Sequence, residues 1–95
     1  MNETDGNNGI ITVLGRDSVG IIAKVCTFLS EKDINILDIS QTIVDGYFSM
    51  LMIVDLDRCA EDFAAIAAGL DRVGGEIGVQ IRLQKESIFD SMNRI

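Results

Sequence analysis

The residues best suited to chemistry begin with a short segment, residues 15–22, between an apolar run and a helical pattern. It consists of Gly15, Arg16, Asp17, Ser18, Val19, Gly20, Ile21 and Ile22. Gly15 can leave the preceding strand at positive φ, and Asp17 or Ser18 can cap the helix by accepting hydrogen bonds from its free amides. Gly20, in the first turn, lets another molecule approach the backbone closely. These features predict a site for a small carboxylate or phosphate; the alternative is a well-capped strand-to-helix turn with no ligand.

A second group of polar residues opens the next predicted strand. Asn35 comes first, and Asp38, Ser40 and Gln41 follow it. A carboxamide both donates and accepts hydrogen bonds, so Asn35 suits the polar end of an α-amino acid. Asp38 could pair with the ammonium group of such a ligand, or with a nearby Lys or Arg, or lie solvated at a strand edge. Capping a turn or starting the strand is the simpler alternative for Asn35.

The composition excludes several kinds of chemistry. The chain contains no histidine, which removes histidine-dependent acid–base catalysis, Cys-His nucleophiles and most zinc sites. Cys26 and Cys59 fit no metal-binding spacing, and Cys26 is expected to be a small buried hydrophobe on a helix face. We therefore predict no catalytic residues, no metal and no cofactor.

Charge and length set the class of protein. The 95 residues are enough for one domain, and the net charge of −7, without a basic patch, argues against a nucleic-acid partner. No apolar run reaches the length of a membrane span, and no signal peptide precedes the first strand. We expect a soluble, cytoplasmic protein without a membrane partner.

The elements that position these residues follow from the hydrophobic pattern. Residues 1–8 predict a disordered lead-in, and residues 10–14 a buried strand. A helix is predicted from about 19 to 32, with Ile22, Val25, Cys26 and Leu29 on one face. A second strand runs to about Val44, and Asp45-Gly46 predicts a type I′ turn into a third strand over 47–54.

The second half of the chain repeats the strand-and-helix order. Asp57 is a plausible cap for a second helix, which Gly74-Gly75 is predicted to end. One face of that helix carries Phe63, Ile66, Ala67, Leu70 and Val73. Strict alternation over 77–83 predicts the last strand, and a short amphipathic helix is predicted from Ser87.

The order β-α-β-β-α-β predicts an α+β fold, the ferredoxin-like βαββαβ sandwich, with a four-stranded antiparallel sheet, two helices on one face and a short C-terminal helix. The predicted domain covers residues 9–84, and residues 85–95 form a helical tail.

The third predicted strand is apolar on both faces. Phe48, Met50, Met52 and Val54 lie on one face, and Tyr47, Leu51 and Ile53 on the other. A ferredoxin-like sheet has one open face, so the second apolar face needs a cover. We predict self-association into a homodimer or a higher homo-oligomer; the alternative is that the tail folds back over its own sheet.

The two polar segments together resemble the motifs of the ACT domain family. Gly15-x-Asp17-x-x-Gly20-Ile21-Ile22 resembles the strand-loop-helix motif of that family, and residues 35–41 resemble its second-strand motif. The resemblance extends from Gly9 to about Leu83, and the tail resembles that of small stand-alone ACT proteins without a fused enzyme.

The resemblance implies a regulatory fold that binds amino acids where two domains meet. By position, the loop backbone from Asp17 to Gly20 and the side chain of Asn35 are the expected ligand contacts. The full set of expected site residues is Arg16, Asp17, Ser18, Val19, Gly20, Ile21, Asn35, Ile36 and Asp38.

The sequence therefore predicts a module that binds a small molecule, most simply an amino acid, and passes that state to an unidentified regulated protein. One alternative is a dimerisation or adaptor domain that binds no ligand. A remote alternative is an acylphosphatase-like hydrolase, for which Arg16 and Asn35 supply the residue types. An RNA-recognition module does not fit the acidic charge, and a metallochaperone would need a Cys-x-x-Cys motif.

Overall fold

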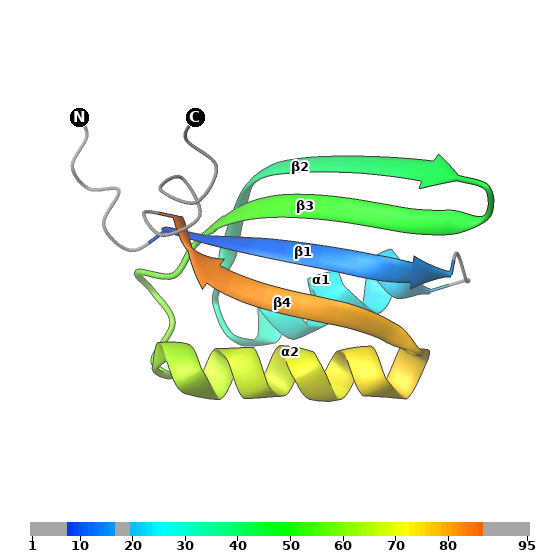
Figure 1. The fold of residues 1–95 in the computed structure, drawn as a ribbon. Coiled ribbons are helices and arrows are strands. Elements are labelled where there is room, and N and C mark those ends of the chain that lie inside the picture. Colours follow the sequence, from blue (N-terminus) through cyan, green and yellow to red (C-terminus); the bar gives the residue numbers. More distant parts are fainter. Residues whose placement is uncertain (1–7, 17–19, 87–95) are drawn as a thin grey trace.

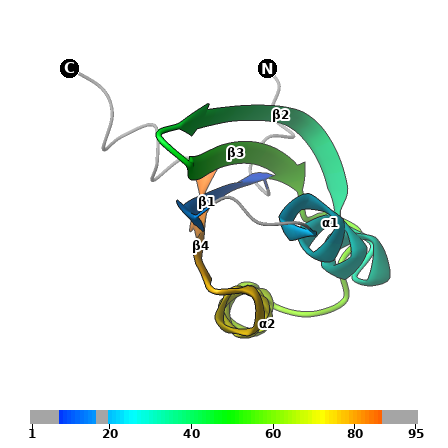
Figure 2. The same cartoon turned by 90° about the vertical axis from the view of Figure 1, so that its right-hand side faces the viewer.

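The computed structural model describes residues 8–16 and 20–86 of the chain. Its elements are β1 (Asn8–Arg16), α1 (Ile21–Glu31), β2 (Asn35–Val44), β3 (Tyr47–Asp55), α2 (Phe63–Ile77) and β4 (Val79–Lys85). The strands form a four-stranded antiparallel sheet in the order β2-β3-β1-β4 (Figure 1). Both helices lie on the same side of this sheet (Figure 2). The predicted ferredoxin-like α+β fold is confirmed; the predicted C-terminal helix lies outside the described residues.

The core fills the space between the sheet and the two helices. From the sheet it takes Ile11 and Val13 of β1, alternate residues of β3 from Phe48 to Val54, and Val79 and Ile81 of β4. From the helices it takes Ile21, Val25 and Leu29 of α1, and Ile66 and Leu70 of α2. Ile22, predicted to share the buried face of α1, is 37% exposed, because Ile21 occupies that face instead.

The opposite face of β3 is apolar, as the sequence predicts. Tyr47 is 50% exposed, and Leu51 and Ile53 are half-buried. Further exposed apolar side chains belong to the edge strand β2: Leu37, Ile39 and Ile43 are 49%, 44% and 57% exposed.

The hairpin between β2 and β3 has the predicted turn. Asp45 and Gly46 both have positive φ, 52° and 81°, as the central residues of a type I′ turn do. A β-bulge at the start of β2, between Ile36 and Asp38, shifts the register against β3. Because of this shift Asp38 pairs with Ile53 rather than with the buried Met52, which keeps its carboxylate off the core face.

β1 is longer than predicted. It continues through Gly15 to Arg16, so Gly15 lies inside the strand and is not at positive φ. A Cβ at Gly15 would lie 2.7 Å from Cγ1 of Val79 on the neighbouring β4. Gly15 therefore allows the two strands to pack closely, and the predicted exit from the strand at this glycine is wrong.

α2 differs from the prediction at both ends. Its N-cap is Asp62, whose Oδ1 accepts a hydrogen bond from the amide of Ala65 at 2.9 Å, rather than Asp57. The helix runs through Gly74-Gly75 to Ile77 and ends at Gly78, which has φ 78°. Consequently β4 begins at Val79 and not at Ile77.

Among the described residues, no helix is long and apolar enough to cross a membrane.

Candidate functional site

Residues 15–22, called the glycine segment below, connect the end of β1 to the start of α1 at one end of the sheet. Its residues 17–19 lie outside the described residues. Arg16 ends β1, and its guanidinium carbon lies 5.3 Å above the centre of the Tyr47 ring, in a cation–π contact. Ile21 is buried in the core and anchors the start of α1.

The start of α1 has a glycine at its N-cap. The N-cap position is occupied by Gly20, rather than by Asp17 or Ser18, and Gly20 has no side chain to accept from the free amides. Its φ of 93° lies in the left-handed region that favours glycine. A Cβ placed on Gly20 would meet no described atom within 4 Å. A glycine N-cap leaves the first-turn amides without a bond from the cap's own side chain, and a helix N-terminus is electrostatically favourable for an anion.

Asn35 lies at the opposite end of the sheet. It opens β2 and pairs with Asp55, which in turn pairs with Asn8, whereas Arg16 pairs with Tyr47. β3 has 9 residues between these two ends, which at about 3.3 Å a residue places them about 26 Å apart. The structure therefore does not bring Asn35 together with the glycine segment of the same chain.

The other two predicted residues of β2 point in different directions. Ile36 is half-buried and packs against the core. Asp38 is exposed, and its Oδ1 accepts a hydrogen bond from the amide of Ile39 at 2.9 Å. Of these two, only Ile36 lines the same pocket as Asn35.

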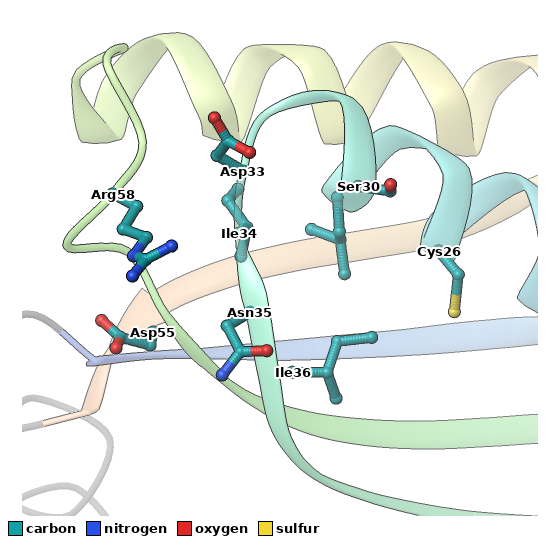
Figure 3. A pocket seen from close by; sticks show the side chains of 9 residues that line it. Cys26, Ser30, Asp33, Ile34, Asn35, Ile36, Asp55 and Arg58 are labelled. Carbon is teal, nitrogen blue, oxygen red and sulfur yellow. The ribbon is translucent and has the colours of Figure 1, made fainter.

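That pocket, of about 720 Å³, lies at the C-terminal end of α1. Figure 3 shows Arg58, Asp55 and Asn35 around one end of it, and Ile36 and Cys26 toward the other. The lining residues come from α1, from the turn after α1 with the start of β2, and from the end of β3 with the segment after it. They are Cys26, Leu29, Ser30, Asp33, Ile34, Asn35, Ile36, Asp55 and Arg58.

Most of this lining was not anticipated from the sequence. Asp55 ends β3 and Arg58 follows it, far along the chain from Asn35, and only the register of β2 with β3 brings them together. A usable signal was present in residues 55–62, where Arg58 is the only cation among several carboxylates. Cys26, expected to be a small buried hydrophobe, is half-buried, and its thiol lines the pocket.

The chemistry available in this pocket is recognition of polar groups. A guanidinium, two carboxylates and a carboxamide line it, together with a hydroxyl, a thiol and the apolar Leu29, Ile34 and Ile36. Over residues 8–16 and 20–86, no group of three or more His, Cys, Asp or Glu is placed to hold a metal ion.

Comparison with known proteins identifies the fold. Residues 9–84 match the ACT domain family model. A UPF0237 protein of Bifidobacterium longum is 57% identical over 89 residues, which cover 94% of this chain and 99% of that protein. An ACT domain protein from Streptococcus pneumoniae superposes with a TM-score of 0.77 at 38% identity, over 87% of this chain and 93% of that chain.

A larger protein contains the same fold. The regulatory subunit of aspartate kinase from Thermus thermophilus, in its ligand-free form, gives a TM-score of 0.66 at 26% identity, over 85% of this chain and 52% of that chain. ACT domains are typically regulatory modules that bind small ligands, and they commonly dimerise. The chain therefore belongs to the ACT domain family, together with small relatives whose whole length is about that of this one domain.

Proposed function

We propose that this protein is a regulatory module that binds an amino acid between the two subunits of a homodimer. The proposal rests on one observation: two features that suit a ligand lie far apart within one chain. The start of α1, where Gly20 is the N-cap, and the carboxamide of Asn35 lie at opposite ends of the sheet. A ligand can contact both only if they come from different subunits.

The edge strand β2 supports a specific arrangement of these subunits. Its exposed Leu37, Ile39 and Ile43 favour pairing with a second copy over exposure to water. If two copies pair antiparallel through β2, Asn35 of one copy lies beside the end of β2 of the other. That end pairs with Tyr47, which pairs with Arg16, next to the start of α1. The antiparallel dimer therefore turns Asn35 toward the same end of the sheet as the partner's glycine segment, within about three strand spacings (about 14 Å) of its Arg16, twice by symmetry.

The regulatory role follows from linkage. A ligand that contacts both subunits stabilises the arrangement that binds it better, and a partner protein can respond to that arrangement. The likeness to an aspartate kinase regulatory subunit supports a regulatory role. The acylphosphatase-like alternative is disfavoured, because it needs Arg16 and Asn35 at one site of one chain.

The first experiment is a thermal-shift screen of the twenty common amino acids. A ligand that binds only the folded dimer must raise its melting temperature. We expect at least one amino acid to do so, and we expect Gly20→Val and Asn35→Ala each to abolish the shift while leaving the dimer intact. Because valine is strained at φ 93°, the shift of Gly20→Val is measured against that variant's own, lower melting temperature. If no amino acid stabilises the wild type, the dimerisation or adaptor alternative replaces the proposal.

A mixed dimer then tests whether the site is shared. In a heterodimer of one Gly20→Val subunit and one Asn35→Ala subunit, one site carries both substitutions and the other carries neither. Calorimetry should therefore recover binding with half the sites of the wild-type dimer. If each site belonged to one chain, the heterodimer would bind nothing.

A further inference from the structure

The pocket at the C-terminal end of α1 has a charge pattern that matches an amino acid. We propose that Arg58 binds the α-carboxylate of the ligand there, and that Ile36 and Cys26 receive an aliphatic side chain. This inference rests on the proposed function, because Asn35 belongs to both the pocket and the shared site. It adds to that function a carboxylate-binding residue and a ligand class.

The fold fixes the backbone around Arg58 but leaves its side chain free. Leu56 is buried in the core, and Cys59 packs against the core as a half-buried residue. The amide of Cys59 donates a hydrogen bond to the carbonyl of Leu56 at 3.1 Å, which closes a turn around Arg58. Arg58 itself is exposed and reaches toward Asn35 and Asp55 (Figure 3). A charged side chain on a fixed turn loses less entropy on binding a ligand than one on a mobile loop.

Among the described residues, Arg58 has no ion-pair partner. Within residues 8–16 and 20–86, no carboxylate oxygen lies within 4 Å of its guanidinium nitrogens. The neighbouring cation, Lys32, is paired with Glu61 at 2.6 Å and lies 5.7 Å from the centre of the Phe28 ring. Arg58 is therefore the cation that this pocket can offer to a ligand. Its planar fork fits a carboxylate through two hydrogen bonds.

The carboxylates of the pocket suit the ammonium group of the same ligand. Oδ1 of Asp55 accepts a hydrogen bond from the amide of Asp57 at 2.9 Å, which orients the carboxylate. Asp33 has a left-handed backbone, with φ 59°, and its side chain also lines the pocket. A cation, two carboxylates and a carboxamide around one opening complement a zwitterion better than a simple anion, which the two carboxylates would repel.

The remaining lining sets the preference for the ligand's side chain. The buried Leu29 and Ile34 line the pocket, and the half-buried Ile36 and Cys26 lie with Ser30 at the end away from Arg58 (Figure 3). The charged lining residues Arg58, Asp55 and Asp33 lie away from this end (Figure 3), so a charged ligand side chain would lose hydration there without gaining one of them as a partner. An aliphatic side chain would instead bury apolar surface, which improves affinity about fourfold for each fully buried methylene.

The test compares L-leucine with L-leucinamide, which lacks the carboxylate, on four proteins by calorimetry. The proteins are the wild type, Arg58→Ala, Arg58→Lys and Arg72→Ala, the last being a matched exposed arginine on α2 outside the pocket. Because a hydrogen bond to a charged group is worth a factor of about 10 to 100, Arg58→Ala should raise the Kd for leucine by that factor. Arg58→Lys should lose less, and Arg72→Ala should bind as the wild type does.

The amide distinguishes carboxylate binding from a general effect of charge. Leucinamide should bind the wild type and Arg58→Ala equally weakly, because without a ligand carboxylate neither protein can form the proposed contact with Arg58. If Arg58→Ala binds leucine as tightly as the wild type, the role of Arg58 is overturned while the proposed function stands. Preference for aspartate or lysine over leucine overturns the aliphatic class. If no common amino acid binds the wild type, the proposed function itself fails.

Discussion

Adjacent glycines near the end of α2 have unlike surroundings. Gly74 is buried against β4, and a Cβ there would lie 2.6 Å from the carbonyl oxygen of Val79. Gly75 is exposed, and a Cβ there would meet no described atom within 4 Å. The sequence shows two equivalent glycines and predicts a helix end. Only the approach of β4 explains why one of them must be glycine.

These two residues give a matched pair of variants. Gly74→Ala places a methyl group against the carbonyl oxygen of Val79, so it should lower the free energy of unfolding by about 1–3 kcal/mol. Gly75→Ala replaces a poor helix former at an open position and should raise it by about 0.5–1 kcal/mol. Urea denaturation of both variants checks the difference. Equal effects would contradict the close packing of α2 on β4.

At the scale of elements, the hydrophobic pattern predicts which segments become strands and helices, and the structure confirms all six described elements. Their ends are predicted less well, because ends depend on tertiary partners. Gly15 stays in β1 because Val79 packs against it, and α1 starts only at Ile21, which the core anchors. The Asp45-Gly46 turn is the exception: its conformation depends on those two residues alone.

The cap of α2 is testable against the neighbouring aspartate that the sequence favoured. Asp62→Ala removes the acceptor for the amide of Ala65 and should cost about 1 kcal/mol of stability. Among the described residues, the carboxylate of Asp57 accepts no hydrogen bond, so Asp57→Ala should change stability by less than about 0.5 kcal/mol. Thermal denaturation monitored by circular dichroism measures both. A larger loss for Asp57→Ala would restore Asp57 as the cap.

At the scale of the whole molecule, the predicted site residues fall into two groups that one chain keeps apart. The sequence places Asn35 directly after the helix that starts at Gly20, which suggests that they are neighbours. However, α1 has 11 residues, and at about 1.5 Å a residue it carries the chain about 16 Å before β2 begins. Sequence motifs thus suggest Gly20 and Asn35 as ligand contacts, but the path of the chain decides how they can meet. The pocket with Arg58 depends on strand register, which no local pattern reveals.

The proposed dimer gives a prediction at this scale. Ile43→Lys puts a charge at the exposed edge of β2 and should convert the dimer to a monomer, as measured by analytical ultracentrifugation. Gln80→Lys, an exposed position on the opposite edge strand β4, is the matched control and should leave the dimer intact. Loss of the dimer in the β4 variant alone would move the interface to the other edge of the sheet.

The distance between Gly20 and Asn35 also bears on how a cell would read such a protein. If each ligand must contact two subunits, only assembled pairs can respond, so the apparent affinity for the ligand falls as the protein is diluted below its own dissociation constant. The level at which the gene is expressed then sets the ligand concentration at which the signal changes. A cell could retune this response by changing protein abundance, without altering a single residue of the pocket.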